Sequence, residues 1–198
     1  MNSLVLLKQC HCIKSTLTLK LLIGSLLSLM EILDKFLPFR QWDEVYQTFL
    51  GNNFPWYYYP FVTDSDEEVE ENKFQFVHII SDLNKGYISS TADDVVKIFN
   101  DRLNAYTILR IKANLTTYQR PPYVPPFHTD LVGPLKDISK TAIFYMNDTN
   151  GGTELEDGTF IEGKGNRLVI LPGDVKHRGV GQTDAPARCV INFNYVER

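Results

Sequence analysis

The feature that most constrains the fold is a change of hydrophobic period near residue 105. From there, "AYTILRIKANLTTY" alternates between two sets of side chains, as a β-strand requires because successive residues face opposite sides. The stretches "KTAIFYMN" and "ARCVINFNYV" follow the same alternation. Between and around them lie turn signals, Asn150-Gly151, Asp157-Gly158, Gly163, Gly165 and Pro172-Gly173. Short strands joined by glycine turns are typical of an all-β sandwich or barrel, of which the double-sheet jelly roll is one form.

The preceding part of the chain, residues 30–105, has a mostly helical pattern. Residues 41–50 place apolar side chains at helical spacing. Residues 91–104 predict a second helix, with Thr91 as its N-cap and Asp93 and Asp94 near its positive end. The stretch "FQFVHII" fits a strand or the start of a helix, and we interpret its His78 as a packed residue. The expected fold is therefore α+β, mainly β, with a jelly-roll core and supporting N-terminal helices.

Length and charge limit the classes of function. With 198 residues, one domain is expected, and we place it at 30–198 with the catalytic core at about 106–198. The net charge of −4 gives no overall positive field, which makes nucleic acid and anionic membranes unfavourable partners. Much of the acidity lies in residues 63–72, which we interpret as a solvated loop. The aromatic stretch 54–61 could stack on bases or sugars, but packing against a sheet is the favoured interpretation.

Cysteine usage and the N-terminus bear on location. Three cysteines form no disulfide framework, which predicts a reducing, cytoplasmic compartment. Cys10-His11-Cys12 lacks the partner cysteines that a zinc site would need. Residues 1–29 are leucine-rich but interrupted by lysines, and the longest apolar run, 21–30, is too short to span a bilayer. No signal-peptidase pattern follows. We interpret 1–29 as a leader or a mis-assigned start before Met30, with a membrane-associated helix as the second interpretation.

Two of the four histidines belong to a candidate metal site. In "PPYVPPFHTDL", His128 and Asp130 are two residues apart and share one side of an extended segment. His177 follows a predicted strand and a Pro-Gly turn. Two imidazoles and one carboxylate that leave other coordination positions open form the facial triad of non-haem Fe(II) oxygenases. An isolated H-x-D pair in a polar turn is common, so the distal histidine is what makes the pattern informative.

A basic residue on the final strand offers a partner for an organic acid. Arg188 has a planar guanidinium that can form a two-pronged pair with a carboxylate. On the predicted strand it shares a face with Val190 and Asn192, whereas the opposite face is apolar. The alternation alone leaves either face as the interior, so a surface arginine remains the competing interpretation.

These motifs together resemble a known family. "HTD", "GGTELEDG", "KGNRLVILPGDVKHRGVGQTDAPAR" and "VINFNY" are similar to the 2-oxoglutarate- and Fe(II)-dependent dioxygenases, in particular their prolyl 4-hydroxylase-like branch. The resemblance covers residues 106–198 and implies a double-stranded β-helix. It implies iron ligands and residues that contact the cosubstrate. The implied ligands are His128, Asp130 and His177; Arg188 and Tyr145 would bind the C5 carboxylate, and Tyr118 and Thr141 would line the pocket.

The resemblance also implies an activity: hydroxylation of a C–H bond with Fe(II), 2-oxoglutarate and O2, releasing succinate and CO2, with L-ascorbate as a possible further requirement. A protein or peptide substrate is favoured, most simply a peptidyl proline. Collagen-type enzymes usually carry lysine in place of Arg188, which weakens the inference to proline. Nucleic acid comes next and small metabolites third, and the oligomeric state is left open. A cupin-type binding protein and an inactive structural domain are the competing classes.

The proline-rich stretch before the ligands has two interpretations. Residues 119–127, "QRPPYVPPF", form a stiff segment because proline restricts the backbone. We expect this segment to supply one wall of the site. A proline-rich ligand for an SH3 domain is the competing interpretation, and its position beside a metal site disfavours it.

Overall fold

The computed structural model describes residues 30–62, 73–87, 89 and 93–198. The interpretations of 1–29, of the Cys10–Cys12 cluster, of the acidic stretch 63–72 and of the Thr91 cap lie outside these residues. Among the helices of the described chain, none combines the length and apolar character needed to cross a membrane.

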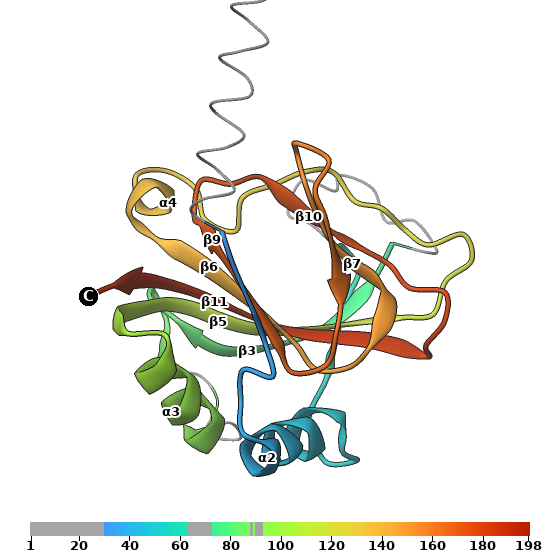
Figure 1. Ribbon diagram of the computed structural model, residues 1–198, viewed down its shortest axis with the longest axis horizontal. Coiled ribbons are helices and arrows are strands. Elements are labelled where there is room, and N and C mark those ends of the chain that lie inside the picture. Colours follow the sequence, from blue (N-terminus) through green and yellow to red (C-terminus); the bar gives the residue numbers. More distant parts are fainter. Residues whose placement is uncertain (1–29, 63–72, 88, 90–92) are drawn as a thin grey trace, which may run out of the picture.

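Most strands belong to one large antiparallel sheet (Figure 1). Its order is β1 (Glu31–Asp34), β9 (Arg167–Pro172), β6 (Lys140–Tyr145), β11 (Ala187–Glu197), β5 (Ala105–Thr117), β3 (Gln75–Asp82) and β2 (Tyr57–Tyr59). The short β4 (Gly86–Tyr87) pairs with β3. The strands predicted from the period-two pattern are confirmed as β5, β6 and β11, and "FQFVHII" belongs to a strand, β3.

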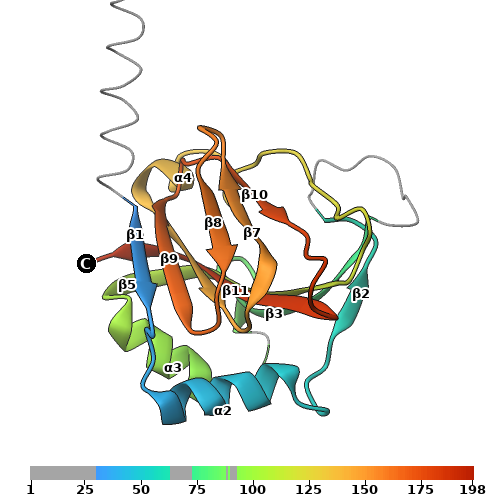
Figure 2. The same ribbon diagram turned by 45° about the vertical axis from the view of Figure 1, so that its right-hand side comes forward.

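A smaller sheet faces the large one. It contains β10 (His177–Val180), β7 (Thr149–Leu155) and β8 (Phe160–Gly163) in that order. His128 forms an isolated antiparallel bridge with His177, which places the loop that carries His128 beside β10. After β5, the chain thus alternates between the two sheets, and the predicted jelly roll is confirmed (Figure 2).

Two helices cover the outer face of the large sheet (Figure 2). They are α2 (Phe39–Leu50) and α3 (Asp93–Arg102), both predicted from helical spacing, whereas α4 (Leu135–Ile138) is a single short turn. Phe99 of α3 packs on Phe144 and Phe193 of the sheet, and Phe49 of α2 belongs to the same apolar cluster. A second apolar cluster, which includes Val169 and Leu155, fills part of the space between the sheets. The large sheet is therefore buried on both faces, and this burial decides where the polar side chains of its strands can point.

The prediction for His78 is confirmed, whereas the prediction for the aromatic stretch 54–61 is confirmed only in part. His78 is 4% exposed, its Nδ1 lies 2.7 Å from the carbonyl oxygen of Pro55, and its ring packs on Phe54. It is a packed histidine, as predicted. Phe54 is buried too, but Tyr57 and Tyr58 on the edge strand β2 are 61% and 60% exposed, so the packing prediction holds only for part of the stretch.

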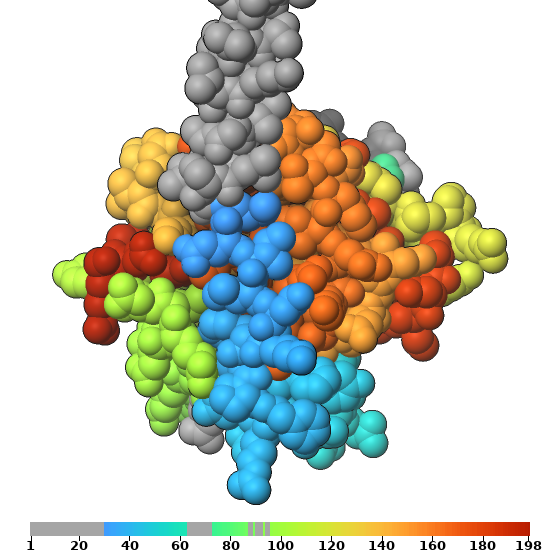
Figure 3. Space-filling model, viewed as in Figure 1, coloured from blue at the N-terminus to red at the C-terminus, as the bar shows by residue number. Residues whose placement is uncertain are grey.

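The segment that begins at residue 30 belongs to the same folded unit. β1 pairs with β9, and Arg167 on β9 donates two hydrogen bonds to the carboxylate of Asp34, at 2.6 and 3.1 Å. Beyond β1, the buried Asn166 bonds both the backbone N–H and the carbonyl of Leu37, each at 2.8 Å. Figure 3 shows this segment, in blue, lying across one face of the molecule between α3 and the strands of the small sheet.

Candidate metal centre and cosubstrate pocket

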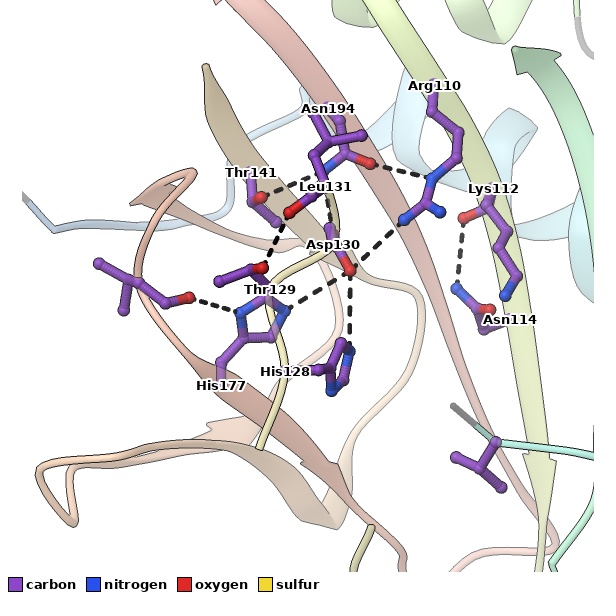
Figure 4. A network of polar contacts seen from close by, with 12 residues as sticks. Arg110, Lys112, Asn114, His128, Thr129, Asp130, Leu131, Thr141, His177 and Asn194 are labelled. Atoms are coloured by element: carbon purple, nitrogen blue, oxygen red, sulfur yellow. Dashed lines mark hydrogen bonds and ion pairs between the residues drawn. The ribbon is translucent and has the colours of Figure 1, made fainter. Parts of the chain in front are cut away.

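The three predicted ligands converge at one end of the space between the sheets (Figure 4). His177 is the first residue of β10, and the bridge to His128 brings the loop with Asp130 alongside it. One ligand atom of each residue lies within 4.8 Å of the other two. The Nε2 atoms of both histidines are 3.8 Å from Oδ1 of Asp130. The geometry brings two nitrogens and one oxygen to a single point, as a shared metal ion would require.

Backbone carbonyls orient both imidazole rings. Nδ1 of His177 lies 3.1 Å from the carbonyl of Val175, and Nδ1 of His128 lies 3.4 Å from that of Pro126. A carbonyl can only accept, so Nδ1 carries the hydrogen and each Nε2 presents its lone pair toward Asp130. This orientation by a neighbouring acceptor is typical of metal-binding histidines. The donor set and its tautomers therefore fit Fe(II) held by a facial triad.

The ionisation states also suit a cation. Burial lowers the pKa of His128, and the neighbouring His177 lowers it further, which favours the neutral imidazole. Burial by itself would raise the pKa of Asp130, but His177, Arg110 and a hydrogen bond from Asn194 together hold that pKa below its ordinary value. The site thus offers a neutral His128 and an ionised Asp130, the forms in which these side chains bind a metal.

A cavity of about 110 Å³ opens in front of the triad. Its walls come from β5, β11, β7 and β10 and from the proline-rich segment, whose Tyr123 and Pro125 line it. The prediction that this segment supplies one wall is therefore confirmed. Gly181, just after β10, donates a backbone hydrogen bond to the carbonyl of Tyr123 at 3.1 Å, which holds that wall in place.

Arg188 lies in this cavity, and its side chain is only partly satisfied. It is 7% exposed, and its Nη2 donates to the carbonyl of Gly152 at 3.0 Å. Its Nε is buried and has no hydrogen-bond partner in the part of the chain that the structure describes. Burial lowers the pKa of the guanidinium. A buried cation that lines a cavity and has a donor without a partner among the described residues is suited to an anionic ligand.

Tyr145 lies beside Arg188, with its ring centroid 5.5 Å from the guanidinium carbon. Its hydroxyl donates to Thr153 at 2.6 Å, and burial raises the pKa of the phenol. Thr153 itself lines the cavity. Tyr145 itself is 0% exposed and is not among the residues that line the cavity, so its carboxylate-binding role stays a prediction.

The other two predicted pocket residues lie elsewhere. Thr141 is 2% exposed and accepts a hydrogen bond from Asn194 at 3.0 Å, so it lies behind Asp130 rather than beside Arg188. Tyr118 is 47% exposed just beyond β5 and does not line the cavity. Its cosubstrate role stays a prediction that its position does not support, and Tyr123 occupies the cavity wall instead.

Sequence reasoning missed several polar residues of the site. Arg110, Lys112 and Asn114 of β5 line the cavity, as does Asn192 of β11. Asn194 contacts Asp130 directly. The sequence did contain a signal, because alternation placed the three β5 residues on one face of a strand whose other face is apolar. Only the pairing of β5 with β11 shows that this polar face turns toward the metal ligands.

Comparison with known proteins supports the architecture. No protein-family model matches the chain, and no curated protein matches it. Among solved structures, an oxidoreductase of the 2OG-Fe(II) oxygenase family from Burkholderia pseudomallei superposes with a TM-score of 0.65 at 11% identity, over 86% of each chain. The chain has the fold of the 2OG-Fe(II) oxygenases.

Two further neighbours differ in what they bind. A prolyl hydroxylase from Trichoplax adhaerens, in complex with a hypoxia inducible factor peptide fragment, matches at 18% identity with a TM-score of 0.57, covering 85% of this chain and 84% of its own. The epimerase SnoN, in complex with Fe3+, alpha ketoglutarate and nogalamycin RO, matches at 9% identity with a TM-score of 0.57, covering 85% and 79%. At such identities the likeness establishes the fold alone, so the activity has to be inferred from this chain's own site.

Proposed function

We propose that the protein is an Fe(II)- and 2-oxoglutarate-dependent dioxygenase that hydroxylates a substrate C–H bond and releases succinate and CO2. The observation that carries the proposal is the joint placement of two groups. His128, Asp130 and His177 present their ligand atoms within 4.8 Å of one another. Arg188 lines the cavity that they border and carries a buried donor without a partner among the described residues.

Each group has a separate task in this proposal. The triad holds Fe(II), which together with 2-oxoglutarate and O2 supplies the oxidising chemistry when bound. Arg188 pairs with the distal carboxylate of the cosubstrate, and Thr153, which also lines the cavity, accepts a hydrogen bond from the buried Tyr145 beside Arg188. Ile143 and Val190, which also line the cavity, exclude water from the region between these two ends.

A protein or peptide substrate, most simply with a proline as the target, is the favoured candidate. His128 is the accessible ligand, with 33% of its side chain exposed, whereas Asp130 and His177 are each 4% exposed. An extended chain could therefore approach the metal from the side of His128, along the wall formed by Tyr123 and Pro125. The peptide-bound prolyl hydroxylase neighbour supports this preference.

A small carboxylic acid is the second candidate, because the cavity contains more positive charge than the sequence suggested. Lys112 lines it together with Arg110 and Arg188. A substrate with its own acidic group would complement these cations. Nucleic acid remains disfavoured by the net charge of −4. A cupin-type binding protein is disfavoured because it would not require the buried Arg188. A cytoplasmic location remains part of the proposal.

The decisive experiment is an anaerobic titration of the protein with Fe(II) followed by 2-oxoglutarate. We expect a weak visible charge-transfer band that needs both additions and is absent from the His177→Ala variant. Coupled succinate release would then be screened with peptide, methylated oligonucleotide and amino-acid pools in the presence of ascorbate. We expect a proline-containing peptide to gain one oxygen atom. A protein that binds neither Fe(II) nor 2-oxoglutarate would refute the proposal, and turnover confined to oligonucleotides would overturn the substrate preference.

A further inference from the structure

Three neighbouring strands of the large sheet send polar side chains toward Asp130 (Figure 4). Arg110 comes from β5, Asn194 from β11 and Thr141 from β6, and all three point into the space between the sheets. Asn194 occupies the centre of the group and is fully buried at 0% exposure. A buried amide of this kind is retained only where its donors and acceptor are satisfied, so its partners are informative.

The hydrogen bonds around Asn194 determine which way its amide points. Arg110 can only donate, and its Nε lies 3.1 Å from Oδ1 of Asn194. The amide nitrogen must then face the other side, where it donates to Oδ2 of Asp130 and to Oγ1 of Thr141, each at 3.0 Å. Both hydrogens and the oxygen of the amide are thereby used. In the reverse orientation, the amide nitrogen would face Arg110 Nε, and two donors would lie opposite each other.

This arrangement makes the two oxygens of Asp130 unequal. Oδ2 accepts the hydrogen bond from Asn194. Oδ1 is the oxygen 3.8 Å from both histidine Nε2 atoms, and Arg110 Nη2 approaches it at 3.5 Å. A carboxylate whose second oxygen is already bonded presents the first one alone to a cation. That binding mode leaves the remaining coordination positions for the cosubstrate and O2.

We propose that Asn194 is a positioning residue that fixes Asp130 as a one-oxygen metal ligand, with Arg110 and Thr141 fixing the Asn194 amide in turn. The inference rests on the proposed function in one respect, namely that a metal ion occupies the triad. Residues behind a ligand commonly change metal affinity when they are replaced, because they set the orientation of the group that binds.

The test is Co(II) binding to the metal-free protein, followed by its visible spectrum and by calorimetry, without 2-oxoglutarate or O2. Asn194→Leu keeps the branched shape of the side chain, with bulkier methyl groups, and removes all three hydrogen bonds of the amide. We expect roughly 10- to 100-fold weaker Co(II) binding and a changed spectrum. Thr141→Val removes one acceptor from the amide and should weaken binding less, whereas Thr141→Ser keeps the acceptor and should restore wild-type affinity.

A matched control comes from a second buried amide, whose side-chain hydrogen bonds among the described residues join it to Leu37 and to none of the metal ligands. The side-chain amide of Asn166 bonds the backbone of Leu37, and the backbone of Asn166 has a φ of 62°, which glycine tolerates. Asn166→Gly should lower the melting temperature and leave Co(II) affinity and spectrum unchanged. If folded Asn194→Leu binds Co(II) with wild-type affinity and spectrum, the positioning role is refuted while the proposed function stands. If the wild-type protein takes up no Co(II), both the positioning role and the proposed function are refuted.

Discussion

Replacement of Arg188 by methionine should weaken cosubstrate binding without harming the free protein. In the free protein the guanidinium is 7% exposed, donates a hydrogen bond to the carbonyl of Gly152 at 3.0 Å and lies beside the ring of Tyr145. Its Nε is unpartnered among the described residues, and burial lowers the pKa of the group. The cation is therefore poorly compensated until a carboxylate enters the cavity.

The substitution Arg188→Met is expected to be unfavourable for 2-oxoglutarate binding and neutral or favourable for the stability of the free protein. Loss of a desolvated partner for a carboxylate costs about 2–5 kcal/mol, which corresponds to roughly a 30-fold to several-thousand-fold rise in the Kd for 2-oxoglutarate. In the free protein, removal of an unsatisfied buried donor relieves about 1–3 kcal/mol, and loss of the bond to Gly152 offsets about 1 kcal/mol of that. Methionine is flexible enough to fill the space. The free variant should thus be about as stable as the wild type, or up to about 2 kcal/mol more stable.

Thermal melting with and without 2-oxoglutarate, in the presence of Mn(II), measures both effects. The wild-type melting temperature should rise with ligand concentration because the ligand binds only the folded state. That rise should disappear in Arg188→Met and persist in reduced form in Arg188→Lys, which keeps the charge but not the two-pronged geometry. A Met variant that melts at a lower temperature and still binds 2-oxoglutarate normally would show that the guanidinium supports the fold instead.

Three further predictions concern the ligands, the chain start and pH. Alanine replacements of His128, Asp130 and His177 should each abolish succinate formation and Co(II) uptake. The control variant His78→Ala should still take up Co(II). Full activity of Asp130→Ala would refute the facial triad. A chain that begins at Met30 should be soluble and active, since β1 begins at Glu31; inactive or insoluble protein would place residues 1–29 within the fold. The hydrogen bond from Arg167 and, after it, the Lys164 contact lower the pKa of Asp34 from 3.8 to about 2, despite the opposing effect of burial. Since the folded pKa is the lower one, this stabilisation is present above pH 3.8 and lost as pH falls toward 2. Asp34 is exposed, so the contribution should stay below about 1 kcal/mol. Melting curves of Asp34→Asn should lie below the wild type at pH 7 and coincide with it near pH 2, and a difference that persists there would refute the assignment.

The sequence allowed prediction of the helices and strands and of the His128–Asp130 pair because both depend on local spacing. The period of two predicted β5, β6 and β11, and the helical period predicted α2 and α3. His128 and Asp130 are close in the chain, so the shared side of an extended segment could be inferred without a tertiary structure. His177 could be added because it follows a predicted strand and a Pro-Gly turn and because the family resemblance implies it as the third ligand.

What only the tertiary structure decided was the surroundings of those ligands. The alternation of β11 left either face as the interior, and the structure shows that both are buried: Ile191 and Phe193 pack toward the helices, while Arg188 and Asn192 face the cavity. The sequence pattern could not tell whether Tyr118 or Tyr123 lines the cavity. The answer depends on the path of the loop, which the hydrogen bond from Gly181 to the carbonyl of Tyr123 holds in place.

The same limit applies to the network behind Asp130. Arg110, Thr141 and Asn194 lie far apart in sequence and meet only because β5 and β6 both pair with β11. Periodicity records which side chains of one strand share a face, since that depends on the backbone of the strand alone. It carries no record of which strands become neighbours, since long-range pairing follows from the burial of the whole sheet between the helices and the small sheet.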